Sequence, residues 1–149
     1  MALNFDHFAT EAATFMKKYA KKLQLEDDMS KAGRVLSSVL HGLREIISTE
    51  ESLQLLAQLP MFLKAVYVNG WTTHIRRNKI KKMSEFIELI RDFNGVTAWH
   101  DFESDAQAKI YINNTFKLLR MYISLGELED IRSELPKDLK SIIYKKMII

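Results

Sequence analysis

One short segment contains all of the chain's excess positive charge. Residues 74–82 hold five cations and no acidic residue, more than the net charge of +3 of the whole chain. The full set with its two ring side chains is Trp71, His74, Arg76, Arg77, Lys79, Lys81 and Lys82. Cations at this density could hold phosphates while an indole stacks on a base. The segment therefore predicts a solvated basic connector between two helical lobes or, as alternatives, a contact with nucleic acid or with anionic lipid.

A second group of polar side chains lies in apolar helical patterns. His41 and Arg44 are one helical turn apart, and a shift of 76 residues places Arg44 on Arg120. Two such arginines could clamp an anionic ligand between the halves of the chain. Alternatively, each arginine pairs with a carboxylate or a helix C-terminus of its own half. His41 has a carboxylate four residues on, but one helix offers only two metal ligands, so no metal is expected.

The sequence lacks the motifs that usually identify catalysis or cofactor binding. It contains no cysteine, which removes thiolate nucleophiles, thiolate zinc sites and iron–sulfur clusters. It also contains no glycine-rich phosphate loop, no Gly-x-Ser-x-Gly elbow and no His-Glu-x-x-His motif. We therefore expect a protein that binds no cofactor. We also expect a non-enzymatic protein rather than an enzyme.

The elements that must position these side chains are predicted to be helices. Apolar residues recur at three- and four-residue steps over roughly residues 4–24, and a second such face follows residue 30. Ser48-Thr49-Glu50-Glu51 predicts a capping box, with Ser48 and Glu51 each bonding to a main-chain amide of the other. Five glycines and two prolines are few for a many-stranded sheet. The fold class is therefore predicted to be all-α.

The second half of the chain repeats the plan of the first. The shift of 76 residues carries Ser48 onto Ser124, Glu51 onto Glu127, and Leu59-Pro60 onto Leu135-Pro136. This predicts two tandem repeats of about four helices each, related by an approximate twofold axis. The repeats span residues 1–73 and 83–149, and residues 74–82 connect them in one compact unit.

One acidic cluster precedes the long helix predicted in each half of the chain. The two clusters are Glu26-Asp27-Asp28 and Asp101-Glu103-Asp105. Carboxylates at such positions complement the helix dipole and cap free amides, so both clusters predict helix N-termini. Neither has the glycine turn and alternating oxygen ligands of a calcium loop.

Several spaced motifs resemble one bacterial family of unassigned function, domain of unknown function 2267. Its first-half signature resembles Phe5-Asp6-His7-Phe8, Val39-Leu40-His41-Gly42-Leu43-Arg44, Ala57-Gln58-Leu59-Pro60 and Tyr67-Val68-Asn69-Gly70-Trp71. Its second-half signature resembles Gly126-Glu127-Leu128-Glu129-Asp130-Ile131 and Leu135-Pro136. The resemblance implies a duplicated helical bundle and no particular activity. Family members follow the Gly-Trp pair with prolines and polar residues, whereas this chain continues into the basic segment.

These observations lead to three hypotheses for function. The first is a non-enzymatic interaction or regulatory module of the bacterial cytoplasm that binds a protein partner or self-associates. The second is a nucleic-acid-associated protein that uses residues 71–82. The third is a small-ligand binder or enzyme at the cleft between the repeats, near His41, Arg44 and Arg120. We expect no transmembrane segment, because no apolar stretch is long enough.

Overall fold

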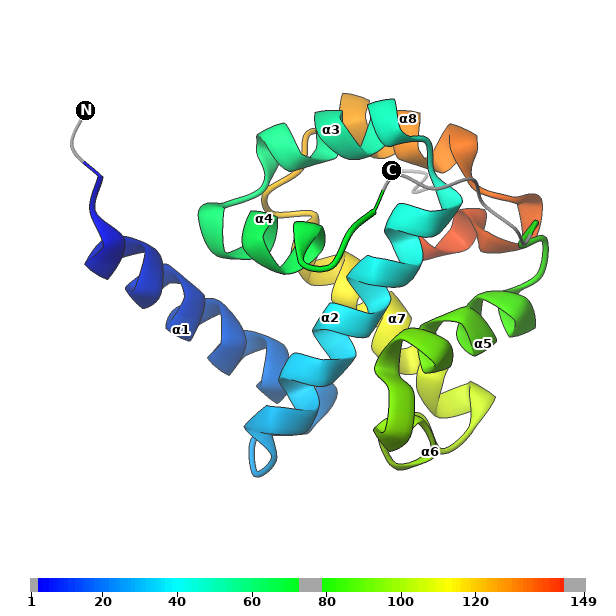
Figure 1. The fold of residues 1–149 in the computed structure, drawn as a ribbon, viewed down its shortest axis with the longest axis horizontal. Helices are drawn as coiled ribbons and strands as arrows, with labels where there is room; N and C mark the ends of the chain where they lie inside the picture. The colour runs from blue at the N-terminus through cyan, green and yellow to red at the C-terminus, as the bar shows by residue number, and fades with distance from the viewer. Residues whose placement is uncertain (1–2, 73–78, 144–149) are drawn as a thin grey trace, which may run out of the picture.

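The computed structural model describes residues 3–72 and 79–143, and these residues form helices joined by short connections (Figure 1). The α-helices are α1 (Phe5–Leu23), α2 (Met29–Ile46), α3 (Thr49–Gln58), α4 (Met61–Val68), α5 (Met83–Asn94), α6 (Ala98–Asp101), α7 (Asp105–Leu119) and α8 (Leu125–Glu134). Two 3-10 helices cover Gly95–Thr97 and Lys137–Ile142. No strand occurs in these described ranges, so the all-α prediction is confirmed.

The helix starts follow from capping side chains in the sequence. Asn4, Asp28, Ser48, Ser104 and Ser124 each accept a hydrogen bond from an amide in the first turn of α1, α2, α3, α7 and α8. Such side chains satisfy donors that have no partner within the helix. Within the described residues, no helix is both long enough and apolar enough to cross a membrane.

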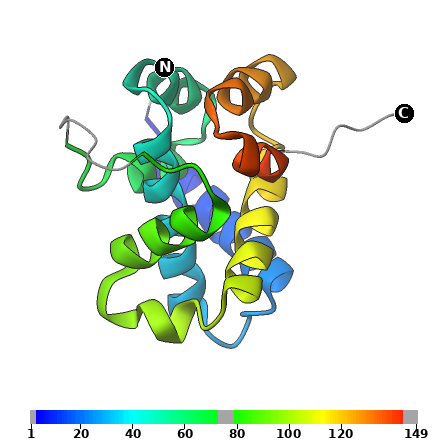
Figure 2. The ribbon, with the colours of Figure 1, turned by 90° about the vertical axis from the view of Figure 1, so that its right-hand side faces the viewer.

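Helix α2 lies at the centre and packs against α1, α4, α5 and α7 (Figure 1). The first half of the chain therefore shares its core with α5 and α7 of the second half. A fully buried hydrogen bond of 2.7 Å between the Tyr19 hydroxyl and Thr115 Oγ1 joins α1 to α7. Helices α3 and α8 lie side by side at one end, and α5 and α6 form the opposite end (Figure 2).

The crossing of α2 and α5 depends on Gly42. A Cβ atom at this position would lie 2.9 Å from Ile90 Cγ1 and 3.2 Å from Phe86 Cε1. We expect Gly42→Ala to lower the free energy of unfolding, because overpacking costs about 1–3 kcal/mol. The gain in helix propensity of about 0.5–1 kcal/mol offsets only part of that cost.

Gly33 provides a matched control on the same helix. No atom lies within 4 Å of a Cβ built there, so Gly33→Ala should stabilise the protein through helix propensity alone. Urea denaturation of both variants measures the difference. Two changes of the same sign and size would contradict a close α2–α5 contact at Gly42.

Candidate functional site

The interface between α3 and α8 is closed by hydrogen bonds between residues far apart in the sequence. The Ser48 amide donates to Glu134 Oε1 at 2.6 Å, and the Ser48 hydroxyl donates to Glu134 Oε2 at 2.9 Å. On the other side, the Ser124 amide donates to Gln58 Oε1 at 2.7 Å, and Gln58 Nε2 donates to Ser124 Oγ at 3.2 Å. The end of each helix therefore holds the start of the other.

These contacts replace one half of the predicted capping box. Ser48 Oγ does accept from the Glu51 amide, and Ser124 Oγ accepts from the Glu127 amide, each at 3.1 Å. The serine amides, however, donate to Glu134 and Gln58 rather than to the two glutamates. The carboxyl groups of Glu51 and Glu127 therefore do not accept hydrogen bonds from the capping serine amides.

Glu51 and Glu127 meet as a buried carboxyl pair. Their residues are only 6% and 5% exposed, and the Oε2 atom of each is buried without a hydrogen-bond partner. Asp130, one turn after Glu127 and exposed to solvent, brings a third carboxylate. One oxygen from each of the three groups lies within 4.8 Å of the others. We refer to Glu51, Glu127 and Asp130 as the carboxylate cluster.

The cluster strongly disfavours a second negative charge at its centre. Burial, a hydrogen bond to Glu51 and the charges of Glu51, Asp130 and Glu134 raise the pKa of Glu127 to about 8. Two adjacent carboxylates in a low-dielectric site cannot both ionise easily. The pair can therefore hold a proton or a cation at neutral pH, which is chemistry that an exposed acidic surface does not provide.

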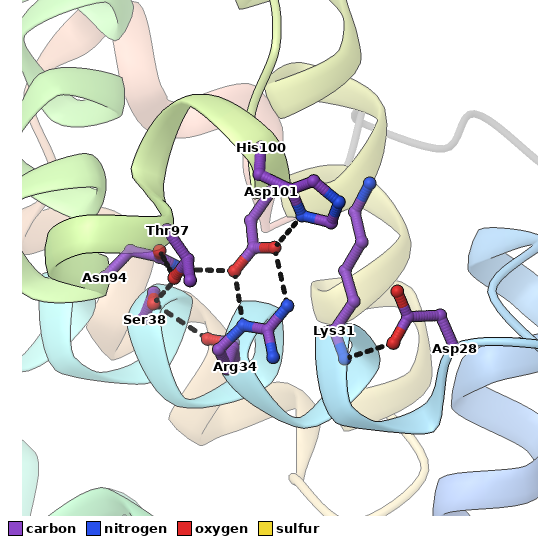
Figure 3. Close-up of polar contacts among 8 residues, drawn as sticks. All are labelled: Asp28, Lys31, Arg34, Ser38, Asn94, Thr97, His100 and Asp101. Carbon is purple, nitrogen blue, oxygen red and sulfur yellow. Dashed lines mark hydrogen bonds and ion pairs between the residues drawn. The ribbon is translucent and has the colours of Figure 1, made fainter.

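A second polar cluster connects α2 to α5 and α6 (Figure 3). Arg34 forms a bidentate ion pair with Asp101, with Nε to Oδ2 at 2.7 Å and Nη2 to Oδ1 at 2.9 Å. Asn94 Nδ2 donates to Asp101 Oδ2 at 2.9 Å, and His100 Nδ1 lies 3.0 Å from Oδ1. Ser38 accepts a further bond from Asn94 and donates to the Arg34 carbonyl.

This second cluster keeps a charged group in the protein interior. The Asp101 side chain is fully buried. Burial opposes its ionisation, but hydrogen bonds from Arg34, His100 and Asn94 outweigh burial and hold the pKa of Asp101 well below its usual range. A carboxylate with three such partners stabilises the junction of α2, α5 and α6.

The predicted inter-repeat residues bind main-chain carbonyls. Arg44 Nη1 donates to the carbonyls of Tyr67 and Asn69 at 2.7 and 2.8 Å, and His41 Nε2 lies 2.8 Å from the Val66 carbonyl. Burial lowers the pKa of His41, and the charge of Arg44 adds to the effect.

The equivalent arginine of the second half is used in the same way. Arg120 donates through Nε and Nη2 to the Ile143 carbonyl, the first bond at 2.7 Å. These contacts match the alternative in which each arginine holds the end of its own half. A shared anion site between Arg44 and Arg120 stays a prediction.

The described part of the basic segment has mixed charge. Trp71 is half-buried, with its ring edge-on to Tyr67 at 5.8 Å between centroids. Lys79, Lys81 and Lys82 are exposed, but Glu85 accepts hydrogen bonds from the Lys81 and Lys82 amides at 2.9 Å. A shallow depression beside Lys79 is also lined by Glu85, Glu88 and Asp92. His74, Arg76 and Arg77 lie outside the described residues.

The two acidic clusters predicted at helix starts differ in outcome. Asp28 caps α2 as predicted, by accepting from the Lys31 amide at 3.1 Å. In the other cluster Ser104 caps α7, Asp105 lies in the first turn, and Asp101 instead pairs with Arg34. The prediction for Asp101 was therefore wrong, because its partner lies 67 positions away and no local pattern identifies it.

The carboxylate cluster was also missed, although the sequence contains a signal for it. Glu51 and Glu127 occupy the same position of the repeated Ser-x-x-Glu motif. In a duplicated chain, equivalent residues meet when they lie on the axis that relates the two copies. The duplication predicted from the sequence therefore made the repeated glutamate a candidate for a self-facing pair.

The fold and the two clusters define an all-α protein that buries a pair of carboxyl groups between α3 and α8. The chain belongs to the DUF2267 family, described as an uncharacterized conserved protein, whose family model matches residues 12–142. The resemblance found from the spaced motifs is thus confirmed. No curated protein matches the chain.

Proposed function

We propose that this protein is a non-enzymatic interaction module that pairs with a second copy of itself through the N-terminal half of α1. The main support for this proposal is that apolar side chains are exposed on the N-terminal half of α1. Phe5 is 71% exposed, and Phe8 is only half-buried. Figure 1 shows these turns of α1 extending away from the other helices.

The exposed side chains continue a stripe that is buried farther along the helix. Phe5, Phe8, Ala12 and Phe15 follow the spacing of one helix face. Phe15 is buried and contacts Phe62 and Tyr122, with ring centroids 5.3 and 6.0 Å away. The same face is therefore core at one end of α1 and unpartnered at the other, which is typical of an interaction surface.

The charges on α1 favour a second copy as the partner. Its first half carries Asp6 and Glu11, whereas its second half carries Lys17, Lys18, Lys21 and Lys22. Two α1 helices packed antiparallel with an offset, so that Phe5 and Phe8 of each copy lie beside the exposed Lys17 and Lys18 of the other, would place Asp6 of each copy near basic residues of the other. Such pairing is self-complementary, as a twofold interface requires.

Replacing the two exposed phenylalanines should disrupt this pairing. Truncating an aromatic residue at the centre of an interface costs about 1 kcal/mol or more, and a twofold interface contains each change twice, which gives about 4 kcal/mol for the two changes. We expect Phe5→Ala/Phe8→Ala to weaken the dimer roughly 700-fold. Alanine is the stronger helix former, so loss of the helix would not explain the result.

Light scattering coupled to size-exclusion chromatography measures the effect over a wide concentration range. Leu125→Ala is the matched control, because Leu125 is 77% exposed on a different helix. We expect the wild type and the control to dimerise alike, and the double variant to elute as a monomer. A wild type that stays monomeric at every concentration would overturn the proposal.

We also infer that the chain is a tandem duplication, with residues 1–73 and 83–149 as the repeats around an approximate twofold axis. The bounds of two helices support this, since α3 (Thr49–Gln58) and α8 (Leu125–Glu134) begin and end 76 positions apart. Their capping serines also have nearly equal φ and ψ, −67° and 158° against −66° and 157°.

Equivalent hydrogen bonds provide independent support for the duplication. Ser48 bonds to Glu134, and Ser124 bonds to Gln58, which exchanges equivalent positions across the proposed axis. Within each half, Arg44 donates to the Tyr67 carbonyl and Arg120 to the Ile143 carbonyl, positions that also differ by 76. Unrelated helical segments would not be expected to share both patterns.

A further inference from the structure

The carboxylate cluster brings together three acidic side chains, two of them buried. Glu127 and Asp130 lie one turn apart on α8, and Glu51 approaches from α3. The charged groups that act on Glu127 are Glu51, Asp130 and Glu134, all of them acidic. Burying uncompensated carboxylates is costly, so the arrangement requires a proton or a cation.

Two buried oxygens of the pair are available to a cation. The Oε2 atoms of Glu51 and Glu127 are buried and accept no hydrogen bond from any described residue. A cation can accept several oxygen ligands at once. Both glutamates are more than nine-tenths buried, so water does not compensate these atoms as it would on an exposed acidic surface.

The spacing of the oxygens fits a single ion. Ligand oxygens lie about 2.0–2.6 Å from magnesium or calcium, so two of them on one ion are at most about 4–5 Å apart. The three carboxylate oxygens of the cluster lie within 4.8 Å of one another. They could therefore contact one ion with little movement of either helix, and the exposed Asp130 provides access from solvent.

We propose that Glu51, Glu127 and Asp130 form a binding site for one hard divalent cation, such as Mg²⁺, Mn²⁺ or Ca²⁺, between α3 and α8. Carboxylate oxygens are the ligands that these ions prefer, and a softer ion would require nitrogen or sulfur donors. Bound there, the ion joins the start of α3 to the start of α8. It would thus stabilise the contact between the two halves of the chain.

The test is titration of the full-length, chelator-stripped protein with Mn²⁺, followed by calorimetry and by the electron paramagnetic resonance signal of the free ion. We expect saturable binding of one Mn²⁺ per chain. Glu127→Gln and Asp130→Asn should each weaken it at least about tenfold, since even the loss of outer partners costs 10–100-fold at metal sites. Competition with Mg²⁺ and Ca²⁺ then orders the three ions.

Glu129→Gln is the matched control, because it removes the same charge from an exposed position of the same helix. Its Mn²⁺ affinity should equal that of the wild type. Circular dichroism checks that each variant is folded, and Asp130→Asn tests the site even if Glu127→Gln is unstable. Absence of saturable binding, or equal affinity in all four proteins, would overturn the proposal. The readout is ion binding, so it is independent of self-association through α1.

Discussion

Asp101→Ala is expected to lower the free energy of unfolding by about 1–3 kcal/mol, the usual cost of leaving buried hydrogen-bonding groups without a partner, because the Arg34 side chain that remains is 37% exposed and can be hydrated. The alanine would leave Arg34 without its bidentate acceptor and Asn94 without the acceptor of its 2.9 Å hydrogen bond. Because these residues join α2 to α5 and α6, the loss affects the contact between the two halves. Urea denaturation at neutral pH measures the change.

The ionisation of Asp101 also determines how the free energy of unfolding should depend on pH. The pKa of Asp101 is depressed in the folded protein, so its contribution is present above the unfolded pKa of about 4 and is lost as pH falls below it. The wild type should lose this contribution on acidification, whereas Asp101→Ala should lack it at every pH. Glu103→Ala, an exposed neighbour, should change stability by less than about 0.5 kcal/mol. Equal effects of the two substitutions would contradict the assigned role of Asp101.

Glu127→Gln is expected to stabilise the protein at alkaline pH in buffer stripped of divalent cations. Because the pKa of Glu127 is raised to about 8 in the folded protein, its contribution is fully present below the unfolded pKa and is lost as pH rises through 8. Glutamine imitates the protonated carboxyl and does not ionise. We expect a gain of about 2–4 kcal/mol above pH 8, and little difference near pH 5.

Thermal denaturation from acidic to alkaline pH measures this effect. Among the described residues, the charged groups that shift the pKa of Glu127 are Glu51 from α3 and Asp130 and Glu134 from α8, and all three raise it. Glu129→Gln controls for the general effect of removing a negative charge. The difference in melting temperature between Glu127→Gln and the wild type should grow from pH 6 to pH 9. A difference that stays constant over this range would contradict a shared proton in the carboxyl pair.

Local patterns in the sequence were sufficient for the helices and for the family. The Ser-x-x-Glu motifs begin α3 and α8 at the predicted residues, because a capping serine acts within its own first turn. Leu59 and Leu135, each followed by proline, end these helices for an equally local reason. The motif resemblance was specific because several such features occur in order.

Contacts between distant residues could not be predicted in the same way. Asp101 lies in a segment typical of a helix start, and only the packing of α2 against α6 reveals Arg34 as its partner. The periodicity of α1 correctly identified one apolar face. It did not show that Phe15 lies in the core while Phe5 on the same face is exposed, because periodicity defines a face and not what covers it.

The most direct test of the proposed pairing uses the absence of cysteine from the chain. Ala9→Cys places one spin label on the exposed part of α1, and Val96→Cys places one on an exposed turn of the second half. Double electron–electron resonance then measures distances between copies. We expect a defined distance between labels at position 9, which disappears when Phe5→Ala/Phe8→Ala is added. Labels at position 96 should give a longer distance or none that is defined. No dipolar signal at position 9, at concentrations where the protein is saturated with partner, would contradict self-association through α1.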